Sequence, residues 1–396
     1  MGLLSKGRVN MIVTSTSIRY GYQRKGGVTV MKHIGEQPLR EGTFNTQGEL
    51  QNSVYFEDAL RAILKRHNWK GATLAYAFVD DSVYIHHAEA EGKLSDAEVV
   101  QYIRTHDGAI FELPFEYSAL AVDVLTDNSK KSLATKTAFR LYAYPLDKFD
   151  KLNETFKAVG LKPVASELTG MSVYRYYLDS LKRTGAESKQ HVLVIHWNVT
   201  GVYITMFSRG KAVFNRHIRI EVPKHVTAPI VNDLIDDVIA DISKLVDFYQ
   251  TSIIATVNDN IEADMMLDED MDADDEDFVK PELSSDVERL VVTGDFDFID
   301  MAQKKLDHVF DIEIYDLSEG QSGEDTYRKK GQKKKRTSAE MSISKDDSRL
   351  GKYGRSTRVS TFSLEHAQRL SAGNYANLKY IDLLGLGLKS SSKAGV

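Results

Sequence analysis

The chain has 396 residues, of which 42% are hydrophobic and 27% are charged, so it can bury two or three ordinary globular cores and is not mainly disordered. With 51 Lys and Arg against 57 Asp and Glu, its formal charge is -6, which excludes the basic balance of a dedicated nucleic-acid binder. No cysteine is present, and this excludes disulfide frameworks, thiol catalysis and zinc–thiolate sites.

The N-terminal residues 1–6 are followed by a strand-like run and not by the apolar stretch of a signal peptide, so we expect the mature chain to begin here. No run of about 18 apolar residues occurs anywhere, and we therefore expect no membrane-spanning helix.

An internal repeat links residues 9–34 to residues 193–218, at an offset of 184 positions. Each copy contains an apolar strand, a polar turn, a second strand, a glycine turn and a third strand. The third strands align Lys32-His33-Ile34 with Arg216-His217-Ile218. The repeat predicts a duplicated, two-lobed α/β fold. The alternative is a chance similarity, because hairpins share their turn chemistry and strand alternation.

The segment between the two copies has a β-β-α-β-β-α pattern. Its first helix follows Ser95, which forms a capping box with Glu98, and its second helix ends at Gly160. This order predicts a small α+β domain inserted at 73–169. We assign 1–72 to the first lobe, together with helices at 170–188 and 360–390.

The second lobe is assigned to residues 189–320. It contains an amphipathic helix at 229–250, a strand at 287–293 that ends at Gly294, a helix through 298–309 and a strand at 312–315. Within this lobe, 262–277 carries ten carboxylates and no basic residue. Ala273 and Val279 stand where a calcium loop requires Gly and Glu, so a solvated acidic loop is the favoured interpretation.

A basic run opens the segment 321–359, which we expect to be disordered. Seven of nine residues in the run are basic: Arg328, Lys329, Lys330, Lys333, Lys334, Lys335 and Arg336. Such a run can hold a protein against an anionic membrane surface, and nucleic acid or the acidic loop of a neighbouring molecule would attract it by the same physics. A loop that serves only solubility is the alternative.

The polar turns of the repeat are the candidate ligand site. They contain Thr14, Ser15, Thr16 and Ser17 in the first copy, and Thr200 and Gly201 in the second. Small hydroxyl residues and turn N–H groups can cradle phosphate. A phosphoryl-transfer site also needs carboxylates that hold Mg²⁺, and neither turn has one.

Several stretches, in matching order and spacing, resemble the PilM proteins of type IV pilus assembly, which are related in fold to the cell-division protein FtsA. They extend from about residue 9 to 317, with a last patch at 378–388. The stretches are Pro38-Leu39-x-Glu41-Gly42 with Gly48-Glu49, the helix 96–104 with Phe111-Glu112-Leu113-Pro114-Phe115, Gly160-Leu161-Lys162-Pro163-Val164, Leu245-Val246-Asp247-Phe248-Tyr249 and Leu383-x-Gly385-Leu386-Gly387-Leu388. The resemblance implies a duplicated actin-like fold with an inserted domain.

In that family each repeat carries an Asp-x-Gly phosphate loop, and these positions fall here on residues 12–14 and 196–198, where both acids and both glycines are absent. The adenosine-side Gly-Gly becomes Gly294-Asp295. The resemblance therefore implies a residual nucleotide cleft at Thr14–Ser17, Thr200, Gly201 and Gly294, without ATPase chemistry. We expect no catalytic residue, no metal and no cofactor, with binding of ATP and Mg²⁺ as the alternative.

The function that the resemblance implies is a cytoplasmic scaffold at the inner face of the cell membrane. Its expected partner is the N-terminal peptide of a bitopic membrane protein of the PilN type, docked next to the inserted domain. Pilus inner-membrane core proteins and the motor ATPase are further expected contacts, and dedicated nucleic-acid binding is not expected. The alternatives are a weak ATP-binding, actin-like switch or polymer, and a cytoplasmic component of a type II secretion inner-membrane platform.

Overall fold

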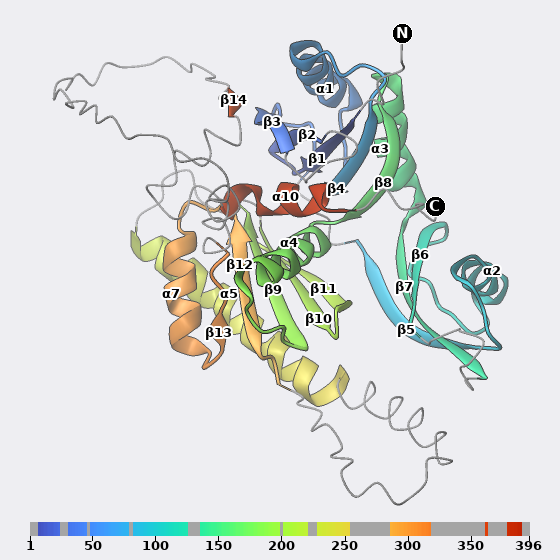
Figure 1. Ribbon diagram of the computed structural model, residues 1–396, viewed down its shortest axis with the longest axis vertical. Coiled ribbons are helices and arrows are strands. Elements are labelled where there is room, and N and C mark those ends of the chain that lie inside the picture. The colour runs from blue at the N-terminus through green and yellow to red at the C-terminus, as the bar shows by residue number, and fades with distance from the viewer. Residues whose placement is uncertain are drawn as a thin grey trace, which may run out of the picture.

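Two mixed sheets with the same strand order form the body of the molecule, and a smaller three-stranded sheet lies beside them (Figure 1). The structure is a computed structural model that describes residues 7–23, 31–45, 48–78, 82–125, 135–198, 201–220, 228–253, 286–317, 361–362 and 378–389.

The first lobe is built on the six-stranded sheet, in the order β14-β3-β2-β1-β4-β8. Its strands are β1 (Arg8–Val13), β2 (Ser17–Gln23), β3 (Met31–Pro38), β4 (Thr73–Phe78), β8 (Lys162–Leu168) and β14 (Thr361–Phe362). The helices α1 (Ser53–His67) and α3 (Leu146–Ala158) pack on one face of this sheet. Their buried side chains share a core with Val9, Met11 and Val13 of β1, because alternate side chains of a strand point to the same face.

The second lobe repeats this sheet in the order β11-β10-β9-β12-β13. Its strands are β9 (His191–Asn198), β10 (Gly201–Ser208), β11 (Lys211–Arg219), β12 (Arg289–Gly294) and β13 (Glu313–Ile314). The helices α5 (Ala228–Phe248), which continues into the π-turn η1 (Tyr249–Ile253), and α7 (Ile299–Val309) pack beside the sheet. The expected helix at 229–250 and the strand before Gly294 are confirmed.

The shared strand order confirms the duplication, but the third strands align at a different offset from the expected one. Arg19 of β2 pairs with Glu36, and the equivalent Tyr203 of β10 pairs with His217. Three more residues separate Gln23 from its partner Met31 than separate Phe207 from Ala212. The structural counterpart of His217 is therefore Glu36, and the expected equivalence of His33 and His217 is wrong.

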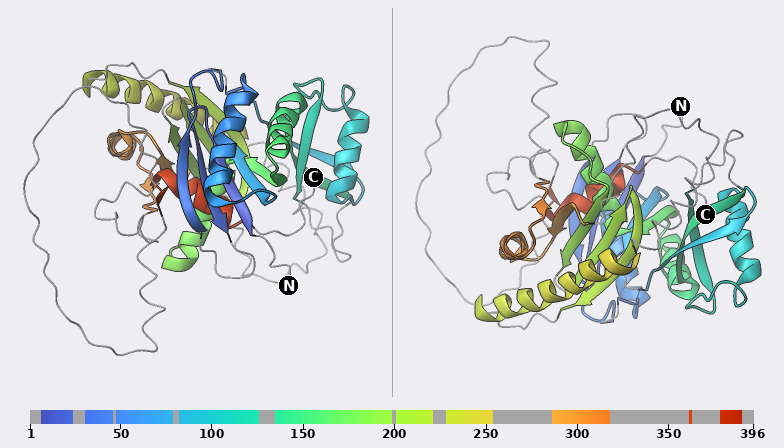
Figure 2. Two further views of the ribbon diagram at one scale, coloured as in Figure 1. Left: turned by 90° about the horizontal axis from the view of Figure 1, so that it is seen from above. Right: turned by 90° about the horizontal axis from the view of Figure 1, so that it is seen from below.

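Two helical segments lie between the sheets of the lobes (Figures 1 and 2). They are α4 (Thr169–Thr184) and the C-terminal pair η3 (Leu378–Tyr380) and α10 (Ile381–Gly387). Buried side chains of α10 pack on the first lobe's sheet, as expected. The helix α4 was assigned to the first lobe, but Val173, Tyr177 and Leu181 belong to the core of the second, because they pack against the sheet of β9 and β10.

The inserted domain is smaller than the predicted 73–169. It comprises β5 (Tyr84–Glu91), α2 (Asp96–His106), β6 (Ser118–Val124) and β7 (Lys136–Pro145), with the sheet order β5-β7-β6. The strands β4 and β8 pair with the first lobe's sheet, and α3 packs on that sheet, so these segments belong to the lobe. The expected capping box is present, with Ser95 N–H donating to Glu98 Oε2 at 2.8 Å.

One face of the inserted sheet is covered by α2, and the other faces the second lobe. Ile85 and Tyr142 pack against the second lobe's core. Lys211 Nζ of β11 lies 3.6 Å from Asp123 Oδ1, which joins the edge of the second lobe to the inserted domain. Asp123 also accepts a hydrogen bond from the Tyr142 hydroxyl at 2.9 Å.

Candidate functional site

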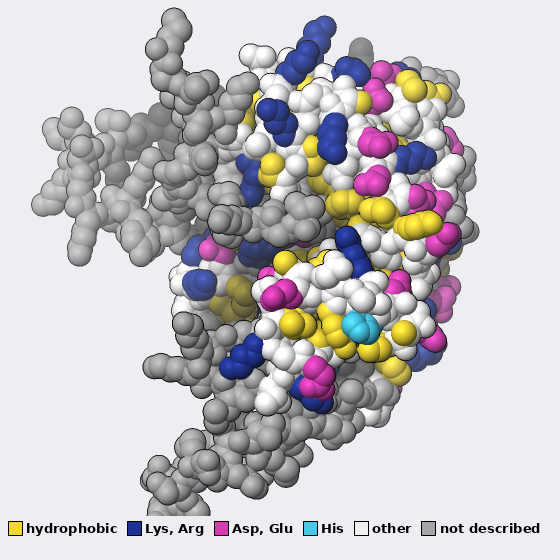
Figure 3. Space-filling model, turned by 90° about the vertical axis from the view of Figure 1, so that its right-hand side faces the viewer, with side chains coloured by type: hydrophobic (Ala, Val, Ile, Leu, Met, Phe, Trp, Pro, Cys, Tyr) yellow, Lys and Arg dark blue, Asp and Glu magenta, His cyan; other side chains and the backbone are white. Residues whose placement is uncertain are grey.

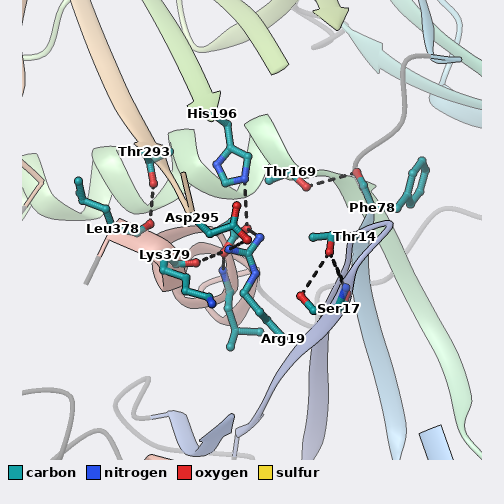
Figure 4. Close-up of polar contacts among 12 residues, drawn as sticks. Thr14, Ser17, Arg19, Phe78, Thr169, His196, Thr293, Asp295, Leu378 and Lys379 are labelled. Carbon is teal, nitrogen blue, oxygen red and sulfur yellow. Dashed lines mark hydrogen bonds and ion pairs between the residues drawn. The ribbon is translucent and has the colours of Figure 1, made fainter. Parts of the chain in front are cut away.

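The turn between β1 and β2 contains the first set of predicted phosphate-binding residues. The Thr14 hydroxyl accepts a hydrogen bond from Ser17 N–H at 2.9 Å and donates to the Ser17 carbonyl at 3.0 Å. Thr16 N–H also points to this hydroxyl, at 3.3 Å, and the Ser17 hydroxyl donates to Glu36 Oε1 at 2.8 Å. The Thr14 hydroxyl thus closes its own turn (Figure 4), and the Ser17 hydroxyl binds the neighbouring strand.

Gly201, the described glycine after the second turn, is covered by a side chain of its own lobe. Thr200 lies outside the described residues, and Gly201 begins β10. A side chain at Gly201 would collide with the imidazole of His217. Since Ser17 and Gly201 are equivalent, as are Glu36 and His217, each lobe places a side chain of its third strand over the residue that begins its second strand.

Gly294 ends β12, where it pairs with Trp197 of β9. Its φ of 137° and its contact with the Trp197 backbone both require glycine, because a Cβ there would overlap the neighbouring strand. The structure therefore supplies a strand-packing reason for this glycine, apart from any contact with adenosine.

A largely buried cluster of ionisable side chains lies between the lobes, near the predicted nucleotide residues (Figure 4). We call it the interlobe cluster, and it consists of Arg19 from β2, His196 from β9, Asp295 after β12 and Asp382 from α10. Arg19 Nη2 donates to Asp382 Oδ2 at 2.6 Å, and Arg19 Nη1 donates to the Lys379 carbonyl at 2.5 Å. Asp295 Oδ2 lies 4.0 Å from Arg19 Nη1. No sequence motif marks Arg19 or Asp382, so sequence reasoning missed them.

The electrostatics of the cluster follow from its burial. Burial raises the pKa of Asp382 to about 6, against the opposing effect of Arg19. Burial, together with the charge of Arg19, lowers the pKa of His196 to about 3, although its Nε2 lies 3.7 Å from Asp382. Burial disfavours the charge of Arg19, but Asp382 and Asp295 outweigh it and raise the pKa of the guanidinium. At neutral pH the imidazole is neutral, and Arg19 faces two carboxylates.

These residues do not fit a magnesium–nucleotide site of the actin-like kind. Ile12 and His196 stand where the resemblance places metal-binding acids, and the described residues contain no group of three His, Asp or Glu side chains that could hold a metal ion. A guanidinium held by two carboxylates lies at the lobe junction. We derive no chemical step through ATP.

A pocket of about 140 Å³ lies in the first lobe at the base of the inserted domain. We call it the junction pocket. It is lined by Val13, Thr14, Ser15, Phe44, Gly48, Glu49, Leu50, Gln51, Phe78, Tyr144, Asp147, Lys148, Lys151 and Leu152. Apolar side chains of β1, β4, β7 and α3 form its walls, and the N-terminal end of α3 supplies Asp147, Lys148 and Lys151 to its rim.

The charged rim of the junction pocket is ordered by hydrogen bonds. Lys148 Nζ lies 3.0 Å from Glu49 Oε1, and Asn45 Nδ2 donates to Glu49 Oε2 at 2.9 Å. Both contacts hold the pKa of the Glu49 carboxyl below its usual value. Lys151 Nζ donates to the Leu50 carbonyl at 2.5 Å. Of the predicted site residues, Thr14 and Ser15 belong to this pocket; the other signal that points to it is the Gly48-Glu49 stretch of the resemblance.

The basic run Arg328–Arg336 and the acidic loop 262–277 lie outside the described residues. Among the helices that the structure describes, none is long and apolar enough to cross a bilayer.

No model of a protein family matches the chain, and a search of curated proteins finds no match. Among solved structures, one described as the PilM-PilN type IV pilus biogenesis complex superposes with a TM-score of 0.53 at 12% identity, covering 79% of this chain and 89% of that one.

Two further structures are less similar. MreB 5 of Spiroplasma citri bound to AMPPNP has a TM-score of 0.38 at 10% identity and covers 82% of this chain and 96% of its own. The cytoplasmic domain of EpsL, an inner-membrane component of the type II secretion system of Vibrio cholerae, has a TM-score of 0.35 at 7% identity, with 74% and 83% covered. The chain thus has the α/β actin-like ATPase fold, with two mixed sheets of equal strand order.

Proposed function

We propose that the protein is an actin-like scaffold of a type IV pilus or competence pilus that binds the N-terminal peptide of a bitopic membrane protein of the PilN type. The observation that carries the proposal is the junction pocket between the first lobe and the inserted domain. It combines an apolar interior with an ordered charged rim, which is the surface that an extended peptide needs for anchoring and orientation.

The similar fold of the PilM-PilN complex supports this proposal, since the PilM chain of that complex has a PilN partner. Apolar side chains are also exposed on the inserted domain, where Ile110 is 58% and Tyr117 is 68% accessible. Figure 3 shows this side of the molecule, on which apolar and charged side chains lie together. Such a surface suits contacts with further proteins, among which we place the pilus core proteins and the motor ATPase.

The interlobe cluster supports a scaffold that does not use ATP. Phosphate groups would have to displace the carboxylates that now surround Arg19, and the turn hydroxyls of Thr14 and Ser17 are already bonded within the lobe. We accordingly place the protein in the cytoplasm at the inner face of the membrane, held there by its partner peptide and by the basic run 328–336.

The test is a direct binding measurement. Fluorescently labelled peptides from the cytoplasmic N-termini of single-span membrane proteins of the same organism are titrated with the full chain and followed by anisotropy. The variant Ser15→Trp places a large ring in the junction pocket, at a half-buried turn residue, and should weaken binding at least tenfold. Gln101→Trp, on the exposed face of α2, is the matched control and should bind like the unaltered protein.

Two results would reject the proposal. One is that no such peptide binds at micromolar concentration. The other is that Ser15→Trp binds as well as Gln101→Trp, because the pocket would then take no part in binding.

A further inference from the structure

The interlobe cluster joins three parts of the molecule that are far apart in the sequence. Arg19 belongs to the first lobe, Asp295 follows the last long strand of the second, and Asp382 lies in the C-terminal helix α10. The side chains of Arg19 and Asp382 are fully buried, and that of Asp295 is 8% exposed. The contacts of this cluster therefore form largely away from solvent, where salt screens them much less than it screens surface charges.

The segment that carries Asp382 is itself bonded to both lobes. On the side of the second lobe, the Thr293 hydroxyl of β12 donates to the Leu378 carbonyl at 2.7 Å. On the side of the first lobe, Lys379 Nζ donates to Glu36 Oε2 of β3 at 2.7 Å, and Arg19 donates to the Lys379 carbonyl. Residues 378–382 thus connect the two lobes, and the Asp382 carboxylate in this segment accepts a hydrogen bond from Arg19.

The burial of Arg19 makes its contacts with the second lobe and with α10 important for the position of the lobes. A buried guanidinium without a carboxylate partner costs several kcal/mol, so Arg19 stays buried only while α10 and the end of β12 stay against β2. Arg19 Nε and Asp295 Oδ1 have no hydrogen-bond partner among the described residues, and their burial opposes closure. The contacts of Arg19 with Asp382 and with the Lys379 carbonyl therefore have to outweigh this cost. The charges favour one closed arrangement of the two lobes.

We propose that Arg19, Asp295 and Asp382 form an internal latch that holds the two lobes in one fixed arrangement without any bound nucleotide. The latch goes beyond the proposed peptide binding and does not depend on it. The Arg19 guanidinium, rather than a bound ligand, holds the two lobes together. Without it the lobes would be free to rotate relative to each other about α4 and α10.

An ion pair within a single lobe, formed by a buried guanidinium and a half-exposed carboxylate, provides the control. Arg289 Nη2 lies 2.5 Å from Glu313 Oε2, and its guanidinium also donates to the Tyr177 hydroxyl at 3.0 Å. Arg289 is 4% exposed, but β12, β13 and the core around Tyr177 all belong to the second lobe. Loss of this pair lowers stability without touching the lobe junction.

The experiment measures the distance between the lobes. Because the chain has no cysteine, spin labels attach only at introduced positions, Arg61→Cys on α1 and Lys244→Cys on α5, both exposed. Double electron–electron resonance is recorded for the labelled chain and for Arg19→Gln, Asp382→Asn and Arg289→Gln in the same background, with and without ATP and Mg²⁺. Circular dichroism and a cooperative urea transition establish that each variant is folded.

We expect one narrow distance in the unaltered and Arg289→Gln chains, with no change on addition of ATP. In Arg19→Gln and Asp382→Asn the distribution should broaden or gain a second, longer component. The latch is rejected if the unaltered chain shows a broad distribution that narrows only with ATP, or if the folded Arg19→Gln or Asp382→Asn chain keeps the narrow distance. If Arg19→Gln does not fold, Asp382→Asn and the unaltered chain still decide between these outcomes.

Discussion

At the scale of single residues, the lobe junction shows how position overrides residue type. Arg19 lies in a strand where polar or small residues alternate with apolar ones, with no motif around it, and yet its side chain is fully buried, like that of Asp382. The hydroxyl of Thr14, a predicted phosphate ligand, bonds to its own turn. In each lobe, a side chain of the third strand occupies the space next to the first residue of the second strand. This side chain is Glu36 in the first lobe and His217 in the second.

The shifted pKa values of His196 and Asp382 in the interlobe cluster make the stability of the protein depend on pH. The titratable groups that face one another there are Arg19, Glu36, His196, Asp295, Lys379, Tyr380 and Asp382. The pKa of His196 in the folded protein is about 3, below the ordinary 6.5 of an imidazole, so His196 lowers the stability as the pH falls below 6.5. The folded pKa of Asp382 is about 6, above 3.8, so Asp382 contributes stability as the pH falls from 6 to 3.8.

Between pH 6 and 4 the two effects oppose each other, because the folded protein takes up a proton on Asp382 and the unfolded chain takes one up on His196. The variant Asp382→Asn removes only the first of them. The difference in unfolding free energy between the unaltered protein and the variant should therefore grow by about 1.4 kcal/mol for each pH unit below 6. Urea unfolding at pH 6.5, 5.5 and 4.5 measures it, and a difference independent of pH would contradict the assignment.

At the scale of elements, the sequence patterns predict which segments are strands and helices better than they predict which sheet each strand joins. The strands at 73–78 and 84–91 lie close together in the chain, but the first pairs with β1 and the second with β7. Alternation and turn residues act locally, whereas the pairing partner of β4 is sixty-odd residues away and is chosen by the packing of both sheet faces.

The same limit explains why the candidate site was only partly predictable. Thr14 and Ser15 were found because small polar residues at a turn are a local pattern. The walls of the junction pocket come from β1, β4, β7 and α3, and the latch combines β2 with α10, so neither could be recognised before the strands were paired. The capping box at Ser95, which needs only four residues, was predicted correctly.

The contact between α4 and α10 gives a prediction at this scale. A Cβ on Gly385 would overlap the backbone of Ser172 in α4, which cannot move without shifting the helix. Gly385→Ala should therefore lower the unfolding free energy by about 1–3 kcal/mol, as overpacking does. Gly387 is the matched control in the same helix, because its Cβ would meet only the flexible end of Met31. Chemical unfolding of both variants tests this, and an equal loss in the two would show that helix contact is not the cause.

The link between the inserted domain and the second lobe gives another prediction. Asp123 is shared by the Tyr142 hydroxyl at 2.9 Å and by Lys211 Nζ at 3.6 Å, and both ion-pair partners are about two-fifths exposed. Solvent screening limits such a pair, so a double-mutant cycle of Asp123→Ala and Lys211→Ala should give a coupling of about 0.2–1 kcal/mol. The cycle Asp123→Ala with Tyr142→Phe should give a larger coupling, because that hydroxyl is shielded by the lobe. If the two cycles give equal coupling energies, the Tyr142 hydroxyl is no better shielded from solvent than Lys211, and the expectation is wrong.

At the scale of the whole molecule, an actin-like fold carries Ile12 and His196 at the two junction positions where the resemblance places acids. Both lobes keep the strand order of the duplicated fold, and the interlobe helices α4 and α10 keep their places between the sheets (Figure 2). The charges at the lobe junction are those of Arg19, Asp295 and Asp382, which are side chains of the protein and not groups of a ligand. The latch and the peptide-binding site that we propose would together make the chain a rigid platform, with binding surfaces at the junction pocket and on the inserted domain.

The last prediction concerns the attachment of this platform to a membrane. The basic run has seven positive charges between 328 and 336, in a chain whose formal charge is -6. Each such residue near an anionic leaflet contributes about 1 kcal/mol, so replacing Lys333, Lys334 and Lys335 by Gln should weaken binding to phosphatidylserine vesicles by about two orders of magnitude. Higher salt should weaken binding of the unaltered chain, because exposed charges are screened.

Replacing the exposed Lys65, Lys93 and Lys244 by Gln changes the net charge equally and should have a much smaller effect. Vesicle co-sedimentation measures all three proteins, and an equal loss in both triple variants would show that net charge, and not the basic run, governs the attraction.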